Sequence, residues 1–446
     1  MSDSRRLLVI SYYFGPDGSV GGLRWAGITK YLARLGWQAS VITATPAVRK
    51  GASSGAHVEW CPRLPTFLDG CRLLRRLALG RGPALAPKHE SIGTPGAELR
   101  GLAGLLRREV AALIAFPDES RGWLVRAALR ARAVIRRFEP QVVISSGPPH
   151  SAHLVAALAT IGRAVRWFID LRDPWGGPLT QAWASHARVG TRVFRTLSTP
   201  LERLTFGAAD GVITNTHQLA AVLTERYPDV RVLCVPNGVD PENLPAPPRH
   251  PYPGLGIAYA GTLYAGRDLG PVVRALRLFL ERHPEAARAG SKLRIAGTAE
   301  LRHARALSDA VAAAGMEQYV ELLGPLPRVQ ALELVCRSRL AVVLAQEQEL
   351  QVPAKLYESV AMGVATLVVA AADSAAGVEG NRIGAIVRDA DDVEGIAGGL
   401  EQLWCDGSGG RSPSPVPITY EAIAPLVDDL LRKTGAQDDA AYQYAR

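Results

Sequence analysis

Short apolar runs alternate along the chain with longer segments in which apolar residues recur every three or four positions. The first run, 7–13, is followed by a loop with four glycines, a helical pattern over 25–35 and a second apolar run over 38–44. A buried strand, a loop, a helix and a second strand in that order are typical of the start of a parallel α/β sheet.

The alternation continues through the rest of the chain. In the first half it predicts strands at 141–147, 164–170, 211–215 and 231–236, and helices at 72–79, 99–116, 123–138, 150–161 and 216–226. Further on it predicts strands at 256–261, 293–297, 320–324, 340–345 and 365–370, and helices at 268–283, 299–314, 327–337, 354–362 and 418–435. The predicted fold class is α/β, with two Rossmann-like, doubly wound parallel-sheet domains facing each other across a cleft.

A proline-rich segment separates the two halves. Residues 241–254 cannot continue a helix or lie in a central strand, so we interpret them as a linker between domains 1–240 and 255–417. A basic helical insertion over 46–138 belongs to the first domain. Residues 418–446 form a C-terminal helix that we expect to pack back towards the N-terminal domain.

Composition narrows the class of protein. Apolar residues make up 48% of the chain and charged residues 21%, which is normal for a soluble globular protein and disfavours disorder. No apolar stretch reaches the roughly 18 to 20 residues of a membrane-spanning helix, and the first residues lack a secretory-signal pattern. The five cysteines have neither metal-ligand nor redox spacing, which favours a reducing cytoplasm.

Positive charge is concentrated in the first half. Residues 1–245 carry 31 Lys and Arg against 18 Asp and Glu, a net charge of +13, whereas the remainder has a net charge of −4. This indicates either a solvated arginine-rich surface or an anionic partner on that half. Membrane-surface docking through Arg126, Arg130, Arg132, Arg136 and Arg137 is one form of the second interpretation. Nucleic-acid binding is disfavoured because no module supports it.

The second half carries the clearest candidate chemistry. Pro353 suits the start of a helix, and Lys355 and Glu358 then lie three positions apart on one face, beyond a predicted strand. A lysine there can neutralise a diphosphate, and a carboxylate one turn further can accept ribose hydroxyls; a plain surface Lys–Glu pair is the alternative. Arg267, just before another helix, could meet the same phosphates and stabilise a departing diphosphate.

The first half has weaker candidates. Gly21 and Gly22 open the first helix, where they form either a structural turn or an anion site. Asp170, Arg172 and Asp173 follow a strand, as a site or as a structural ion pair. His150 lies at a strand–helix junction, where it could position an acceptor or lie on the surface.

No metal ion is expected as a cofactor. A DxD pattern occurs only at Asp389–Asp391, in an acidic loop that we interpret as a solvated turn. The two cations proposed for the diphosphate would perform the task that a metal performs elsewhere.

Taken together, the motifs resemble those of the family 4 glycosyltransferases, which have the GT-B fold. The resemblance rests on these segments in order: ISYYFGP with Gly21-Gly22, FPDESRGW (116–123), VVISSGPPHSAHL (142–154), DLRDPW (170–175), ITNT (213–216), VPNGVD (235–240), AGTLYAGR (260–267) and VPAKLYESVAMG (352–363). The subgroup that it most resembles is bacterial and assembles surface polysaccharides or related glycans.

The resemblance implies a retaining, metal-independent transfer of sugar from a nucleotide diphosphate donor to a glycan, lipid-linked or small-molecule acceptor. It implies that Glu358 binds the donor ribose and that Arg267 and Lys355 hold the diphosphate. It also implies that Gly21-Gly22 lie against the phosphates and the acceptor and that Gly324-Pro325 edge the base. Arg172-Asp173 occupies the place of a polar pair facing the sugar. The residues expected to act in catalysis are Arg267, Lys355, Asp173 and His150, the last two with Arg172 on the acceptor side.

One position departs from the family pattern. Many members carry two glutamates eight positions apart, and the first falls here on Leu350. Either Glu349 takes its role, or backbone amides near Gln351 and Val352 hold the donor sugar. The alternatives to a transferase are an inactive GT-B scaffold and a sugar-nucleotide epimerase or hydrolase. We expect a cytoplasmic protein, with peripheral contact to the inner face of the cell membrane as an open alternative.

Overall fold

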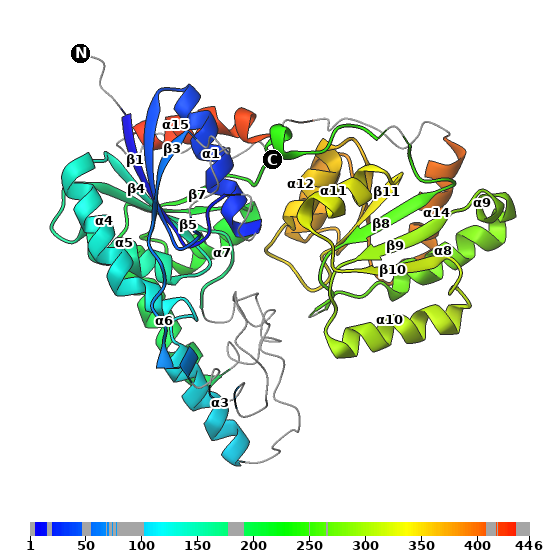
Figure 1. The fold of residues 1–446 in the computed structure, drawn as a ribbon, viewed down its shortest axis with the longest axis horizontal. Helices are drawn as coiled ribbons and strands as arrows, with labels where there is room; N and C mark the ends of the chain where they lie inside the picture. Colours follow the sequence, from blue (N-terminus) through cyan, green and yellow to red (C-terminus); the bar gives the residue numbers. More distant parts are fainter. Residues whose placement is uncertain are drawn as a thin grey trace. The chain divides into compact units, whose positions relative to one another are not determined.

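All strand pairs in the computed structural model of the chain are parallel among the residues described, and they form one sheet in each of two units (Figure 1). The residues described are 5–15, 20–46, 55–67, 69–70, 74, 77, 102–176, 191–248, 250–264, 266–406, 416 and 418–433. Unit 1 comprises Met1–Asn215, Leu219–Val235 and Ala424–Arg446, and unit 2 comprises Thr216–Gln218 and Pro236–Ile423.

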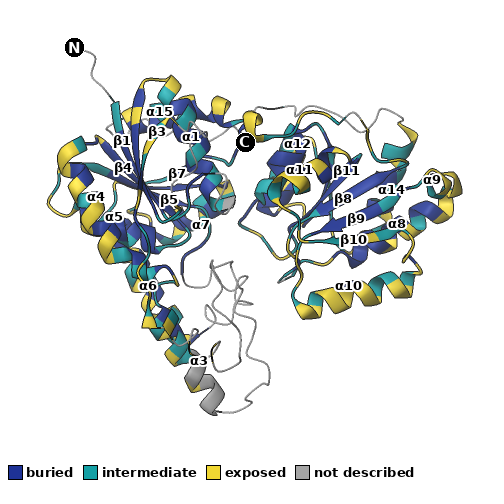
Figure 2. Cartoon of the chain, viewed as in Figure 1, coloured by how far each residue is buried: buried dark blue, intermediate teal, exposed yellow. Residues whose placement is uncertain are grey.

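The sheet of unit 1 has seven strands in the order β3-β2-β1-β4-β5-β6-β7. Their bounds are β1 Arg5–Ser11, β2 Trp37–Thr43, β3 Ala56–Trp60, β4 Val142–Gly147, β5 Arg166–Leu171, β6 Gly211–Thr214 and β7 Val232–Cys234. Strands β4, β1 and β2 are almost entirely buried, as expected for a parallel sheet covered on both faces (Figure 2).

Helices cover both faces of this sheet. Their bounds are η1 Val20–Gly22, α1 Leu23–Arg34, α3 Leu102–Ala115, η2 Arg121–Trp123, α4 Leu124–Phe138, α5 Ser151–Thr160, α6 Arg192–Gly207, α7 His217–Arg226 and α15 Tyr420–Arg432. Helices α4 and α5 lie on one face, whereas α1 and α15 lie on the other (Figure 1). Helix α3 packs along α6, and its Glu109 carboxylate accepts hydrogen bonds from the amides of Arg192 and Val193 at the start of α6.

The last helix is anchored on the first sheet. The carboxylate of Asp428 accepts hydrogen bonds from Arg5 at 3.2 Å and from the indole of Trp37 at 2.8 Å. The guanidinium of Arg166 in β5 donates to the carbonyl oxygens of Leu431 and Lys433 at the helix end. These bonds tie the chain's last described residues to strands formed by its first half.

The sheet of unit 2 has six strands in the order β10-β9-β8-β11-β12-β13. Their bounds are β8 Gly256–Ala260, β9 Lys292–Ala296, β10 Val320–Gly324, β11 Leu340–Leu344, β12 Ala365–Val369 and β13 Ile386–Arg388. The helices are η4 Pro241–Asn243, α8 Gly270–Arg282, α9 Pro284–Arg288, α10 Leu301–Ala314, α11 Arg328–Cys336, α12 Ala354–Ala361, α13 Ala375–Arg382 and α14 Val393–Cys405. Helices α8, α10 and α14 pack together, and Phe279 and Leu400 lie among the buried residues there.

The predicted α/β class with two doubly wound sheets is confirmed, and the matching elements agree with the predicted ranges to within a few residues. Strands β3 and β13 and helices α6, α9, α13 and α14 were not predicted. The predicted helix at 72–79 and much of the insertion 46–138 lie outside the described residues. None of the helices within the described ranges is long and apolar enough to cross a membrane.

Candidate active site

Each sheet reverses its strand order at one point, and ligands of doubly wound folds bind beyond the carboxyl ends of the strands at that point. In unit 1 the reversal lies between β1 and β4, and in unit 2 it lies between β8 and β11. The residues after β8 and β11 include Arg267, Lys355 and Glu358. The residues after β1 and β4 include Gly21, Gly22 and His150.

Lys355 lies in the first turn of α12, which begins directly after Pro353. Its ammonium is 5.4 Å from the ring centroid of Tyr259 and lies against the backbone of Gly261, where any side chain would collide with it. Burial and, second, the nearby Arg267 lower the pKa of Lys355 to about 8, while Glu358 opposes the shift. The site therefore holds a desolvated cation beside a second cation.

Arg267 lies on the loop between β8 and α8. Its guanidinium donates to the carbonyl oxygen of Thr262 at 3.4 Å and lies 4.5 Å from the ring centroid of Tyr264. The loop is fixed by Gln346, which follows β11: its amide oxygen accepts from Asp268 N at 3.1 Å, and its amide nitrogen donates to Asp268 O at 2.8 Å. The ends of β8 and β11 are thus held together, which keeps Arg267 close to Lys355.

Glu358 lies one turn beyond Lys355 on α12 and is only 7% exposed. Its Oε1 accepts a hydrogen bond of 2.6 Å from the Arg328 guanidinium, in an ion pair that joins α11 to α12. The sequence reasoning did not single out Arg328. The sequence contains a pattern that could have identified Arg328. It follows Pro327 at a predicted helix start, as Lys355 follows soon after Pro353.

The predicted base-edge and donor-sugar residues lie on loops of the same unit. Gly324 ends β10 with φ of +68° and Pro325, next in the chain, is exposed. The Glu349 side chain is exposed, whereas Gln351 and Val352 are buried. The carbonyl of Leu350, where the family pattern has a glutamate, accepts a hydrogen bond of 2.7 Å from the Thr216 hydroxyl.

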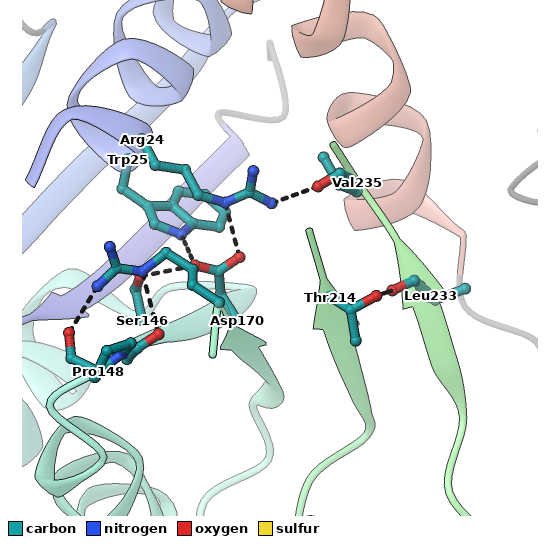
Figure 3. Close-up of polar contacts among 10 residues, drawn as sticks. Arg24, Trp25, Ser146, Pro148, Asp170, Thr214, Leu233 and Val235 are labelled. Carbon is teal, nitrogen blue, oxygen red and sulfur yellow. Dashed lines mark hydrogen bonds and ion pairs between the residues drawn. The ribbon is translucent and has the colours of Figure 1, made fainter. Parts of the chain in front are cut away.

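In unit 1, Asp170 at the end of β5 is fully buried and is held by three side chains (Figure 3). Its carboxylate accepts from Arg24 Nε at 3.0 Å, from Trp25 Nε1 at 2.9 Å and from Ser146 Oγ at 2.7 Å. Arg24 also donates to the carbonyl of Val235 at 2.8 Å. Asp170 is therefore a structural anchor that joins α1 to β4, β5 and β7, and its ion-pair partner is Arg24 rather than Arg172.

Arg172 and His150 lie nearby, on the loops after β5 and β4. Arg172 donates to the carbonyls of Gly147 at 3.1 Å and Pro148 at 2.7 Å. The His150 ring stacks on Trp175 with centroids 5.0 Å apart. Burial, then His153 and Arg172, hold the pKa of His150 well below its usual range, so the ring is neutral at physiological pH. A neutral ring can accept a hydrogen bond from a hydroxyl group.

Asp173 follows Arg172 on the same loop and has polar partners of its own.

The glycine pair Gly21 and Gly22 lies at the start of the first helix. Gly22 is the last residue of η1, and its carbonyl accepts a hydrogen bond of 3.2 Å from the Gly15 amide. A Cβ at Gly22 would lie about 3.0 Å from backbone atoms of Phe14 and Gly15, so a side chain there would be crowded. This close approach supports the structural-turn interpretation of Gly22, while Gly21 is half-buried.

Two family models match the chain in tandem. Glycosyltransferase Family 4 matches residues 85–243, and Glycosyl transferases group 1 matches residues 260–406. These two domains define a glycosyltransferase of the GT-B type. The chain belongs to the glycosyltransferases that pair a family 4 domain with a group 1 domain.

Solved structures show the same fold. Sucrose-phosphate synthase from Thermosynechococcus elongatus has a TM-score of 0.59 and 13% identity, covering 96% of this chain and 98% of that chain. Anabaena Alr3699/HepE in complex with UDP and glucose has a TM-score of 0.56 and 12% identity, covering 97% and 100%. No curated protein gives a significant match.

We predict that Asp170→Ala lowers the free energy of unfolding by about 3–5 kcal/mol, because it leaves the Arg24 guanidinium buried without its carboxylate. Urea unfolding followed by tryptophan fluorescence measures the change. Asp229→Ala, at an exposed aspartate of the same unit, serves as the control and should change stability by less than about 0.5 kcal/mol. Equal stability of the two variants would show that Asp170 is not an anchor.

Proposed function

We propose that this glycosyltransferase moves a sugar from a nucleoside diphosphate sugar to an acceptor hydroxyl, without a metal ion and with retention of anomeric configuration. The observation that carries the proposal is the placement of Arg267 and Lys355 together at the switch point of unit 2, with Glu358 one turn away. A buried ammonium beside a guanidinium is a site for a polyanion.

The charge of the leaving group explains why two cations are needed. As the bond between the sugar C1 and the diphosphate oxygen breaks, negative charge grows on the diphosphate. Arg267 and Lys355 stabilise that charge. The acceptor oxygen bonds to C1 on the same face, and its proton passes to the departing diphosphate oxygen, so no protein nucleophile or general base is needed.

We assign the remaining donor contacts to the same unit. Glu358 accepts the ribose hydroxyls, the loop at Gly324-Pro325 edges the base, and the donor sugar is held by Glu349 or by the backbone near Gln351 and Val352. Alr3699/HepE, of similar fold, was solved with UDP and glucose, which supports a nucleotide-sugar donor for this chain.

On the acceptor side we assign His150, Arg172 and Asp173 of unit 1. The neutral His150 ring can accept a hydrogen bond from an acceptor hydroxyl, and the stacking on Trp175 holds the ring in place. The acceptor is a glycan, a lipid-linked sugar or a small molecule. We place the reaction in the bacterial cytoplasm, in polysaccharide assembly; the free thiols Cys61, Cys234, Cys336 and Cys405 suit a reducing compartment.

We predict that Lys355→Ala lowers kcat/KM for the donor about 100- to 1000-fold, because one of two transition-state cations is lost. Lys292→Ala is the matched control, since this lysine lies at the opposite, amino end of β9 in the same unit. EDTA should leave the wild-type rate unchanged, and proton NMR of the product should show the donor's anomeric configuration. Normal turnover by Lys355→Ala, or free sugar or an epimer as the product, would contradict the proposal.

We predict that kcat/KM for the donor falls as the pH rises through about 8, the pKa of Lys355. Only the protonated ammonium neutralises phosphate, so activity is complete below this pKa and is lost above it. Lys355→Arg keeps its charge at all these pH values and should remove the fall. A flat wild-type profile between about pH 7 and 9, or the same fall in Lys355→Arg, contradicts the role of Lys355.

We also propose that α4 contacts an anionic membrane surface. Its outer face exposes Val125 and Leu129, each 67% exposed, beside Arg126 and Arg136. Neither arginine forms an ion pair within the described part of the chain. The other arginines of the helix are already engaged: Arg130 and Arg137 pair with Glu59, and Arg132 donates to the carbonyl of Ile161.

The prediction is that the protein sediments with phosphatidylglycerol vesicles but not with phosphatidylcholine vesicles. Arg126→Glu with Leu129→Glu should weaken sedimentation about tenfold or more. Leu322→Glu, at a leucine of unit 2 that is 65% exposed, should have no effect. Equal sedimentation of all three proteins would show that α4 is only a solvated face.

A further inference from the structure

The ion pair between Arg328 and Glu358 joins the start of α11 to the middle of α12. We propose that Arg328 is a positioning residue that fixes the Glu358 carboxylate for the donor ribose, and so ties the loop before α11 to recognition of the ribose hydroxyls. The inference rests on the proposed function, since it assumes that Glu358 meets a ribose.

The loop before Arg328 is conformationally restricted for reasons visible in the sequence. Gly324 has φ of +68°, which favours glycine, and its carbonyl accepts a hydrogen bond of 2.8 Å from the Gly297 amide. Pro325 and Pro327 each fix a backbone φ angle, and the Pro327 carbonyl accepts the first helical hydrogen bond, from Ala331, at 2.9 Å. Arg328 is therefore presented at a fixed place, as the first residue of α11.

The geometry suits a carboxylate that still has to bind hydroxyl groups. Arg328 Nη2 lies 2.6 Å from Glu358 Oε1, and the two side chains are 32% and 10% exposed. Glu358 Oε2 accepts no hydrogen bond from the described residues. A carboxylate offers about four acceptor positions, so the contact with Arg328 leaves room for both hydroxyls of a ribose. The guanidinium holds the carboxylate without saturating it.

Arg328 also gives Glu358 a cation other than Lys355. Lys355 and Glu358 lie three positions apart on α12, where side chains of opposite charge attract each other. Without Arg328, the Glu358 carboxylate would be free to turn towards Lys355 and form an ion pair with it. The ammonium that we assign to the diphosphate would then already be neutralised. Arg328 thus keeps the ribose and diphosphate contacts separate.

The test compares binding of a nucleoside diphosphate with and without its ribose hydroxyls. The probe is whichever of the ribonucleotides UDP, GDP and ADP binds most tightly, together with its 2′,3′-dideoxy counterpart, measured by isothermal titration calorimetry. We expect the wild-type protein to bind the dideoxy compound about 100-fold more weakly, because hydrogen bonds to a charged acceptor are lost. In Arg328→Ala the ratio of the two dissociation constants should shrink to about tenfold or less. The same reduced ratio is expected for Glu358→Gln.

Three further variants separate positioning from general stability. Arg302→Ala removes an arginine near the start of α10 that pairs with Glu300 at 3.5 Å, and it should keep the wild-type ratio. Arg328→Lys retains charge but loses the planar fork, so its ratio should be intermediate. In the double variant Arg328→Ala/Glu358→Gln, the ratio of the affinities for the two probes should be no smaller than in Glu358→Gln alone. A second readout is the alkaline limb of the pH profile of kcat/KM. It should move to higher pH in Arg328→Ala, because the approach of the Glu358 carboxylate raises the pKa of Lys355.

The outcomes are distinguishable. If the wild-type protein discriminates between the two probes and Arg328→Ala keeps the full ratio, the role of Arg328 is overturned and the proposed function stands. If the wild-type protein binds no nucleoside diphosphate, the proposed function fails, and the role of Arg328 fails with it.

Discussion

Lys355 is held in an environment that disfavours its charge. Lys355 is half-buried with its ammonium near Tyr259 and Gly261, a second cation lies nearby, and within the described ranges no carboxylate forms an ion pair with it. Burial of a charge without a partner is unfavourable, and the lowered pKa expresses that cost. An anionic ligand would remove that cost, which is the physical reason for our proposal that a polyanion binds here.

The fold makes this arrangement possible through its strand order. Because β8 and β11 are adjacent but far apart in the sequence, the loops that follow them meet at one edge of the sheet. Glycine at position 261 leaves space for the lysine, and a proline begins the helix that presents it. Unit 1 uses the same geometry differently: Asp170 fixes the strand ends there, and the loops after β4 and β5 carry the half-buried His150 and Arg172.

Local patterns in the sequence predicted much of the fold. Apolar strands alternating with amphipathic helices were sufficient for every strand of both sheets except the edge strands β3 and β13, because each buried strand is a short apolar run. The edge strand β3, with sequence AHVEW, lacks such a run, and α6 contains Pro200, which obscures a helical pattern. Helix α13 is short and contains two glycines, so its pattern is weak as well.

Spacing alone predicted the candidate site only where its residues are close in the chain, and Arg267 was included because it precedes another predicted helix. Lys355 and Glu358 are three positions apart, so helical geometry alone places them on one face. The ion pairs of Arg328 with Glu358 and of Arg24 with Asp170 join residues 30 and 146 positions apart. Such pairs depend on how the strands are ordered in the sheet, which hydrophobic periodicity does not specify.

The most direct test of the polyanion site is a crystal structure of the protein with a nucleoside diphosphate. The account predicts diphosphate oxygens within about 3 Å of Lys355 Nζ and the Arg267 guanidinium, with the ribose hydroxyls on Glu358. A nucleotide bound elsewhere, with Arg267 and Lys355 making no contact to phosphate, would contradict it.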